Sequence, residues 1–251
     1  MALKVFVTGA SSGLGEALAR HYAAQGAQLG LVARRADLLH ALAASLQPTP
    51  ALYALDVRDA DALCKAAGDF ISRFGVPDIV VANAGVSKGT LTEHASDLEV
   101  FRQVFDTNVM GMVNTFHPFI VPMREKGNGT LVGIASVAGF RGIPGGGAYS
   151  ASKAAVITYC ESLRVELRDA GVSVVTICPG YIRTPMTNVN RFKMPFIIPV
   201  EEAVVRFARA IDAKTSFTVI PWNMGLAARV LRIMPNWLYD RVFSHMPRKP
   251  R

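Results

Sequence analysis

The sequence predicts an α/β protein in which helices cover both faces of a doubly wound, parallel sheet of seven strands. Seven short apolar runs rich in Val, Ile and Leu lack regular alternation with polar residues, which is typical of parallel strands buried on both faces. Stretches of helical spacing separate these runs, as crossover connections between parallel strands require. Of the 251 residues, 51% are hydrophobic and only 18% are charged, so the chain has enough apolar surface for one large core.

The predicted strands follow the apolar runs in chain order, at residues 3–7, 29–33, 51–55, 79–82, 130–135, 172–178 and 217–220. The clearest helices are expected at residues 15–25, 59–74 and 149–170. Ser96 and Glu99 have the spacing of a capping box, so another helix is expected to begin there and run towards Met123. No linker or repeat interrupts this order, which predicts one domain over residues 1–221 and an extension at 222–251.

Composition and segment lengths argue against membrane-spanning, secreted and metal-binding proteins. No uninterrupted apolar run reaches the roughly 18 residues of a membrane-spanning helix. The N-terminus has no charged and apolar leader, so a cytoplasmic protein is expected. The three cysteines, Cys64, Cys160 and Cys178, are odd in number and far apart, which predicts neither a disulfide framework nor a metal site.

A glycine-rich loop joins the first predicted strand to the first predicted helix. Its candidate cofactor-binding residues are Gly9, Ser11, Ser12, Gly13, Leu14 and Gly15. Glycines permit a tight turn and let backbone amides and the helix N-terminus approach a pyrophosphate. Because the motif lies between a strand and a helix, it predicts a Rossmann-type site for a dinucleotide.

The end of the second predicted strand carries Arg34 and Arg35. An NAD-binding domain usually has an acidic residue there, which binds the adenosine ribose hydroxyls. Two guanidinium groups favour a 2′-phosphate instead, so the sequence predicts NADP(H) rather than NAD(H). The alternative is that both arginines only open a solvated helix.

Tyr149 and Lys153 are four residues apart and share one face of a predicted helix. A nearby cation favours the phenolate, so Lys153 is expected to lower the pKa of Tyr149 towards the range useful for proton exchange with a substrate oxygen. Ser136 ends the fifth predicted strand, at the carboxyl edge where open α/β sheets bind ligands. These three residues are therefore predicted to meet in one catalytic site.

Together the motifs resemble those of the short-chain dehydrogenase/reductase family, in its main single-domain branch. The resemblance covers about residues 3–221 and rests on an ordered set of positions: the glycine-rich loop, Asp56 with Val57, Asn83 to Gly85, Asn108, Ser136, Tyr149 with Lys153, and Pro179 with Gly180 followed by Thr184. It implies an NADP(H)-dependent oxidoreductase in which Tyr149 donates a proton during carbonyl reduction and accepts one during alcohol oxidation. It also implies that Lys153 holds the nicotinamide ribose, that Ser136 orients the substrate oxygen, and that Asn108 holds a water relay to Lys153.

The resemblance also assigns the remaining cofactor contacts. Asp56 and Val57 would contact the adenine, and the cofactor cleft would be lined by Asn83, Ala84 and Gly85. The nicotinamide carboxamide would be bound by the segment containing Pro179, Gly180, Ile182 and Thr184. One departure is Ser12, because many NADP-using members carry a basic residue at that position of the glycine-rich loop. Selectivity for the phosphate would therefore depend on Arg34 and Arg35.

A substrate lid is expected at about residues 185–200. Its apolar side chains predict an adaptable wall for a hydrophobic ketone, aldehyde or secondary alcohol, formed by Met186, Phe192, Met194, Phe196 and Ile197. It remains open whether these side chains touch the substrate or pack beneath the lid. A 3-oxoacyl group or a long-chain lipid ketone is an alternative substrate, and a catalytically dormant NADP(H)-binding regulator is an alternative of another class.

The extension at residues 222–251 carries five of the eight net positive charges. A helix is expected at 223–234, ended by Pro235, with one polar stripe formed by Gly225, Arg229, Arg232 and Asn236. A second short amphipathic piece follows. The apolar surface of the extension would pack on the lid or a neighbouring subunit, or it would contact an anionic membrane peripherally. Stacking aromatic residues do not interleave with the bases, so no nucleic-acid partner is expected. The resemblance implies a homodimer or homotetramer built from the helices at about 97–126 and 149–170.

Overall fold

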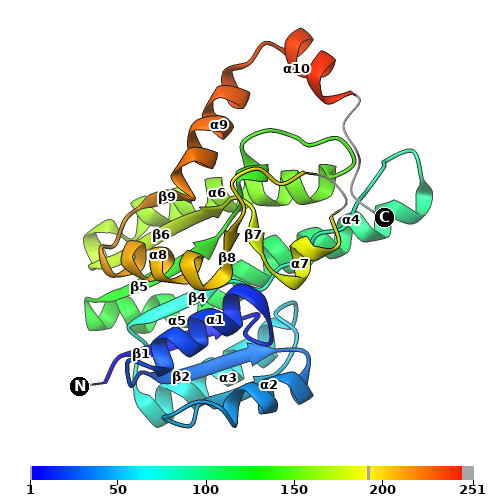
Figure 1. Cartoon of the computed structure of the whole chain (residues 1–251). Coiled ribbons are helices and arrows are strands. Elements are labelled where there is room, and N and C mark those ends of the chain that lie inside the picture. Colours follow the sequence, from blue (N-terminus) through cyan, green and yellow to red (C-terminus); the bar gives the residue numbers. More distant parts are fainter. Residues whose placement is uncertain (1, 191–192, 245–251) are drawn as a thin grey trace.

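The computed structural model describes residues 2–190 and 193–244, and its main feature is one parallel sheet of seven strands (Figure 1). In spatial order, the strands are β3 (Ala51–Ala54), β2 (Gln28–Ala33), β1 (Lys4–Thr8), β4 (Ile79–Ala82), β5 (Gly129–Ile134), β6 (Val172–Pro179) and β9 (Phe217–Ile220). All neighbouring pairs are parallel. The predicted doubly wound, seven-stranded fold is therefore confirmed.

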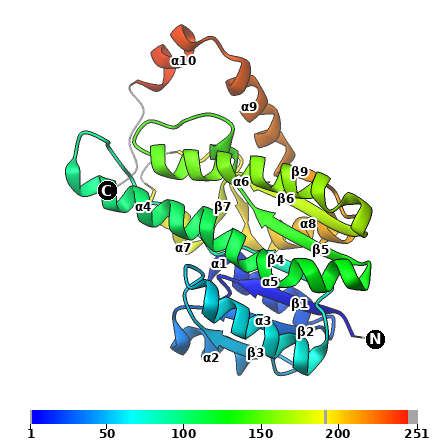
Figure 2. The same ribbon diagram turned by 180° about the vertical axis from the view of Figure 1, so that it is seen from behind.

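Helices cover both faces of the sheet, as the two opposite views show. One face is covered by α1 (Gly13–Ala23), α2 (Ala36–Ala43) and α8 (Val200–Asp212), and the other by α3 (Ala60–Phe74), α4 (Ala95–Phe105), α5 (Gly111–Lys126) and α6 (Gly147–Glu166) (Figure 2). Burial on both faces explains why the run of strand β1 is apolar throughout. Val5 and Val7 belong to the core under α1, whereas Phe6 belongs to the core under α3 and α5. A strand with two buried faces has no polar alternation.

The helix expected from Ser96 to Met123 differs from the structure at its start and in its middle. Helix α4 begins at Ala95 after His94, and the predicted capping box of Ser96 with Glu99 is wrong. The hydroxyl of Ser96 instead bonds the Asp97 carboxylate, which also accepts a hydrogen bond from the Leu91 amide. The carboxylate thus joins the preceding loop to the start of the helix. In the middle of the expected helix, a π-helical turn, Asp106–Met110, separates α4 from α5.

The connection order positions the ligand-binding edge of the sheet. Strand order reverses between β1 and β4, because β2 and β3 extend one side of the sheet while β5 and β6 extend the other. In doubly wound sheets a crevice opens at the carboxyl ends of the strands at this reversal. The glycine-rich loop follows β1 at this crevice, and α6 lies beside the segment that follows β5.

The C-terminal extension forms two helices, α9 (Trp222–Ile233) and α10 (Asn236–Phe243), which rise beyond the sheet in both views (Figures 1 and 2). Pro235 separates them, as predicted from its sequence position. A short helix, α7 (Pro185–Asn188), and a two-stranded sheet of β7 (Ile182–Arg183) and β8 (Ile198–Pro199) form the segment between β6 and α8. Within the described ranges, no helix is both long and apolar enough to cross a bilayer.

Candidate active site

Close backbone contacts hold the glycine-rich loop against the end of β4. Gly9 has a φ of +68°, and a Cβ atom there would lie 2.8 Å from the Asn83 side-chain nitrogen. At Gly15, a Cβ atom would lie 2.3 Å from the carbonyl oxygen of Gly9. Asn83 Nδ2 donates hydrogen bonds to the carbonyl oxygens of Thr8 (3.0 Å) and Gly9 (3.3 Å). Both glycines are therefore required by the fold of the loop itself.

The two arginines after β2 have different partners. Arg35 donates from Nη2 to the hydroxyls of Ser11 (2.9 Å) and Ser12 (2.7 Å), so its guanidinium lies on the glycine-rich loop. Arg34 Nη1 lies 3.5 Å from Oδ2 of Asp56. Partial burial would raise the pKa of Asp56, but the hydrogen bonds and charge of Arg58, together with the charge of Arg34, hold that pKa below its ordinary value.

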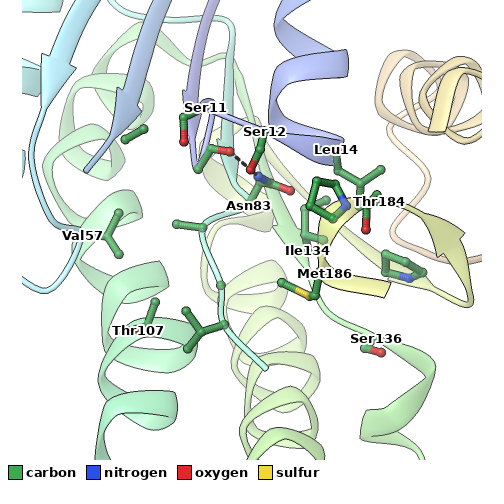
Figure 3. A pocket seen from close by; sticks show the side chains of 18 of the residues that line it. Ser11, Ser12, Leu14, Val57, Asn83, Thr107, Ile134, Ser136, Thr184 and Met186 are labelled. Atoms are coloured by element: carbon green, nitrogen blue, oxygen red, sulfur yellow. Dashed lines mark hydrogen bonds between the residues drawn. The ribbon is translucent and has the colours of Figure 1, made fainter. Parts of the chain in front are cut away.

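A first cavity of ≈ 290 Å³ extends from these arginines to Tyr149 and Lys153. Figure 3 shows Ser11, Ser12 and Asn83 near one another and Ser136 in a separate part of the cavity. The predicted site residues in its wall are Gly9, Ser11, Ser12, Gly13, Leu14, Arg34, Arg35, Asp56, Val57, Asn83, Ala84, Gly85, Ser136, Tyr149, Lys153, Pro179, Gly180, Ile182 and Thr184. Gly15 and Asn108 are not part of this wall. The sequence reasoning did not name Thr107, Ile134 or Thr187, which also line it.

Tyr149 and Lys153 lie side by side, but the pKa of Tyr149 is not lowered as expected. Lys153 is 4% exposed, and its ammonium donates to the carbonyl oxygen of Ile134 (2.8 Å) and lies 5.9 Å from the centre of the Tyr149 ring. Burial raises the pKa of Tyr149 above its ordinary value, and a side-chain hydrogen bond with Ser136 only opposes that rise. The expected lowering by Lys153 is therefore not found. Burial also lowers the pKa of Lys153 to about 8.

Asn108 is 1% exposed, and its side chain bridges two other segments. Its Oδ1 accepts from the Val86 amide (2.8 Å), and its Nδ2 donates to the Val86 carbonyl oxygen (3.0 Å) and to Ser152 Oγ (3.0 Å). It lies within the π-helical turn between α4 and α5. Asn108 thus joins this turn to α6 and to the segment after β4.

A second cavity of ≈ 220 Å³ adjoins the first. The two share five lining residues, Ser136, Tyr149, Gly180, Met186 and Thr187. The remaining wall comes largely from the loop at residues 140–146 and from the inward face of the extension, with apolar side chains of Phe140, Ile143, Tyr181, Met224, Leu231, Tyr239 and Phe243. The sequence predicted no site residue in the extension, although packing on the substrate lid was one expectation. Its inward face and Met186 of that lid both form part of this cavity.

Arg141 ties the extension to the domain. Its Nη1 donates to the carbonyl oxygens of Leu231 and Met234 (2.6 Å), and its Nη2 donates to Asn236 Oδ1 (2.9 Å). The guanidinium carbon also lies 3.9 Å from the centre of the Tyr239 ring, a cation–π contact. Arg141 therefore caps the end of α9 and holds the start of α10.

Three of the four residues predicted to form a polar stripe on the extension contact the domain. Gly225 is buried against Val219, where a Cβ atom would lie at 3.0 Å. Arg232 donates to the Phe140 carbonyl oxygen (3.1 Å), and Asn236 is bonded to Arg141. The helix is instead oriented so that several of its large apolar side chains face outwards.

The predicted lid wall is correct only in part. Met186 lines both cavities. Phe196 is 54% exposed, and Met194, Phe196 and Ile197 are not in the wall of either cavity, so for these three the structure favours the alternative that they do not touch the substrate. Phe192 lies outside the described residues.

Comparisons with known proteins agree with this arrangement. The short chain dehydrogenase family matches residues 3–194. This protein is a member of that family. The chain is 41% identical over 240 residues to an uncharacterized oxidoreductase of Myxococcus xanthus, covering 93% of each protein.

Two solved structures share the fold. A short-chain dehydrogenase from Streptomyces avermitilis superposes with a TM-score of 0.80 at 26% identity, covering 98% of this chain and 100% of that one. An alcohol dehydrogenase from Thermococcus sibiricus complexed with 5-hydroxy-NADP gives a TM-score of 0.77 at 28% identity, covering 88% of this chain and 96% of that one.

This family member is therefore an oxidoreductase that uses a nicotinamide cofactor. The first cavity has the residues expected for such a cofactor at the reversal point of the sheet. In the described part of the chain, no group of three or more His, Cys, Asp or Glu residues is placed to hold a metal ion.

Proposed function

We propose that this short-chain dehydrogenase is NADP(H)-dependent and interconverts a hydrophobic ketone or aldehyde and its alcohol, with Tyr149 as the acid and base. The observation that carries the proposal is that Ser136 and Tyr149 lie in the walls of both cavities. One cavity has the residues of a dinucleotide site, and the other is lined mainly by apolar side chains. A substrate oxygen at their junction is within reach of both hydroxyl groups.

The first cavity suits a dinucleotide with a 2′-phosphate. Gly9 and Gly13 keep the loop free of side chains at its turns, both with positive φ. Arg34 and Arg35 are exposed cations in the wall, and the nearby carboxylate of Asp56 is paired with Arg34 and Arg58. When bound, the nicotinamide supplies or accepts the hydride. The residue types at this end favour binding the phosphorylated form.

The chain's own residues supply the proton. Burial keeps the Tyr149 phenol protonated, which suits a proton donor to a carbonyl oxygen. Ser136 bonds the phenol and would orient the same substrate oxygen. Because its pKa is about 8, Lys153 carries a positive charge at neutral pH, and this charge stabilises the phenolate left after proton transfer. Asn108 positions the turn beside α6, and we propose that it also holds a water relay to Lys153.

The second cavity favours an apolar substrate. Its wall combines Met186, Met224 and Leu231 with aromatic side chains, and adaptable methionines suit variable apolar shapes. A 3-oxoacyl group or a long-chain lipid ketone remains the alternative substrate. A catalytically dormant NADP(H)-binding regulator is the alternative of another class. The presence of Ser136, Tyr149 and Lys153 in one site argues against it.

A steady-state screen of ketones, aldehydes and alcohols with NADPH and with NADH tests this proposal. Turnover of apolar carbonyl compounds with a preference for NADPH is expected. Tight NADPH binding without turnover of any substrate would instead support the regulator.

We also propose a homodimer or homotetramer and a cytoplasmic location. The outer sides of α4 to α6, including the turn between α4 and α5, carry large exposed apolar residues, Leu98, Met110, Val121 and Val165. Such surfaces are suited to helix pairing between subunits. Light scattering at micromolar concentration tests the assembly, and a monomer would contradict it.

A further inference from the structure

The outward face of α9 and α10 is apolar and exposed. Trp222, Ile233 and Trp237 are 73%, 82% and 68% exposed, and each is among the most exposed large apolar side chains described. Leu226 and Val230 on α9 and Val242 on α10 are also at least half exposed. Trp222, Leu226 and Ile233 are spaced four and seven residues apart, so they form one stripe along α9. We call these six residues the outer face.

Packing within the domain does not explain the outer face, because the opposite side of the same helices does the packing. Met224, Ala228 and Leu231 line the second cavity, and Arg141 fixes the ends of both helices. The two helices also rise beyond the sheet (Figure 1), and all six side chains of the outer face are at least half exposed. A group of large apolar side chains exposed in this way marks an interaction site.

The charges around the outer face distinguish between its possible occupants. On α9, Arg229 stands between Leu226 and Ile233 in the sequence, and on α10 Arg241 precedes Val242. Asp240 is the only acidic residue in the extension. A second copy seated symmetrically on this face would bring the arginines of both copies together, whereas an anionic surface would be attracted by them.

We propose that the outer face binds the surface of an anionic lipid bilayer. The two tryptophans have the amphipathic rings that prefer the headgroup level, the aliphatic side chains would enter the acyl boundary, and the arginines would meet lipid phosphates. The inward side of the same helices lines the second cavity, so binding would place that cavity beside the lipid. This last consequence depends on the proposed function, but the binding itself does not.

The chain contains its own probe for the experiment, because Trp222 and Trp237 are its only two tryptophans. The full-length protein is mixed with vesicles of phosphatidylcholine containing phosphatidylglycerol, or of phosphatidylcholine alone, and tryptophan emission and co-sedimentation are measured. A blue shift and sedimentation with the anionic vesicles at low salt are expected, and added salt should reverse both.

Two matched variants locate the contact. Ile233→Glu should abolish vesicle binding, and because Ile233 is 82% exposed the melting temperature should be unchanged. Val205→Glu places the same charge on an exposed position of α8, and binding should be retained. Turnover of a water-soluble carbonyl substrate should be equal in both variants, so a failure of vesicle binding is separable from a failure of the proposed function.

Three results would overturn the proposal. The first is an unshifted emission with anionic vesicles at low salt. The second is equal loss of binding in Val205→Glu and Ile233→Glu. The third is a blue shift that grows with protein concentration without vesicles, accompanied by an oligomer that Ile233→Glu dissociates, because a second copy would then be the occupant.

Discussion

The two cavities meet at Ser136 and Tyr149 but are held together in different ways. The wall of the first is formed by loops at strand ends, where Asn83 bonds the backbone of Thr8 and Gly9. The wall of the second depends on the loop at 140–146 and the extension, joined chiefly through the side chain of Arg141. The first is therefore built into the sheet, whereas the second is attached to it.

The two cavity walls should differ in how far they tolerate substitution. Backbone contacts within a sheet tolerate little change, so the cofactor side should be fixed in shape. A wall held by a few side-chain contacts with a pair of terminal helices can vary without disturbing the sheet. Substitutions are therefore expected to act on cofactor binding or on substrate use separately, except at the shared residues.

The largest effect is expected at the junction itself. Tyr149→Phe removes the hydroxyl but keeps the ring, so turnover should fall by about 10² to 10⁴, the usual contribution of a positioned acid–base group. NADPH affinity, measured by titration, should be nearly unchanged. The matched control is Tyr181→Phe, which removes a hydroxyl from the second cavity only and should lower turnover far less. Near-normal turnover of Tyr149→Phe would refute its role.

A change at the far end of the first cavity should affect the cofactor alone. Arg34→Ala or Arg35→Ala should weaken NADPH binding about tenfold or more, because a charge-assisted contact to phosphate contributes roughly 1.5–3 kcal/mol. NADH binding and KM for the carbonyl substrate should change little. Arg20→Ala, which removes an exposed arginine paired with Glu16 on α1, is the control. Equal affinities of the unmodified protein for NADH and NADPH would contradict the assignment.

Loss of the Arg141 contacts should affect the substrate alone. Arg141→Met removes the hydrogen bonds to α9 and α10, and kcat/KM for apolar substrates should fall by about threefold to tenfold, or roughly 1 kcal/mol. Limited proteolysis should cut the extension faster, while NADPH affinity stays the same. Arg232→Met loses one bond to the Phe140 carbonyl oxygen and should show a smaller effect. A parallel loss of NADPH affinity would mean that the two walls are not separable.

The smallest effect is a pH dependence at the junction. Burial lowers the pKa of Lys153 to about 8, so its ammonium is charged below that pH and loses its proton as the pH rises through it. Carbonyl reduction should therefore slow by a few-fold above about pH 8. Lys153→Arg keeps the charge at all these pH values, so any activity it retains should lack this decline. An unchanged decline in that variant would assign it to another group.

Much of the cofactor side could be predicted because its signals are local. Apolar runs without alternation located all seven strands, and the spacing of glycines between a strand and a helix located the turn after β1. The same local reasoning failed at Ser96. No capping box forms there, and the Asp97 carboxylate accepts a hydrogen bond from the Leu91 amide. It also missed the π-helical turn around Asn108, because that turn is held by partners on other segments.

Sequence alone thus determined the sheet, the glycine-rich loop and most residues in the wall of the first cavity, since strand period, turn chemistry and helix spacing act between near neighbours. Only the tertiary structure decided the pKa direction of Tyr149, because burial depends on everything packed around the phenol. Only the tertiary structure also showed which side of the extension faces inwards. That orientation depends on Arg141 and on partners 90 to 95 residues further along the chain, a separation that no periodicity in the sequence records.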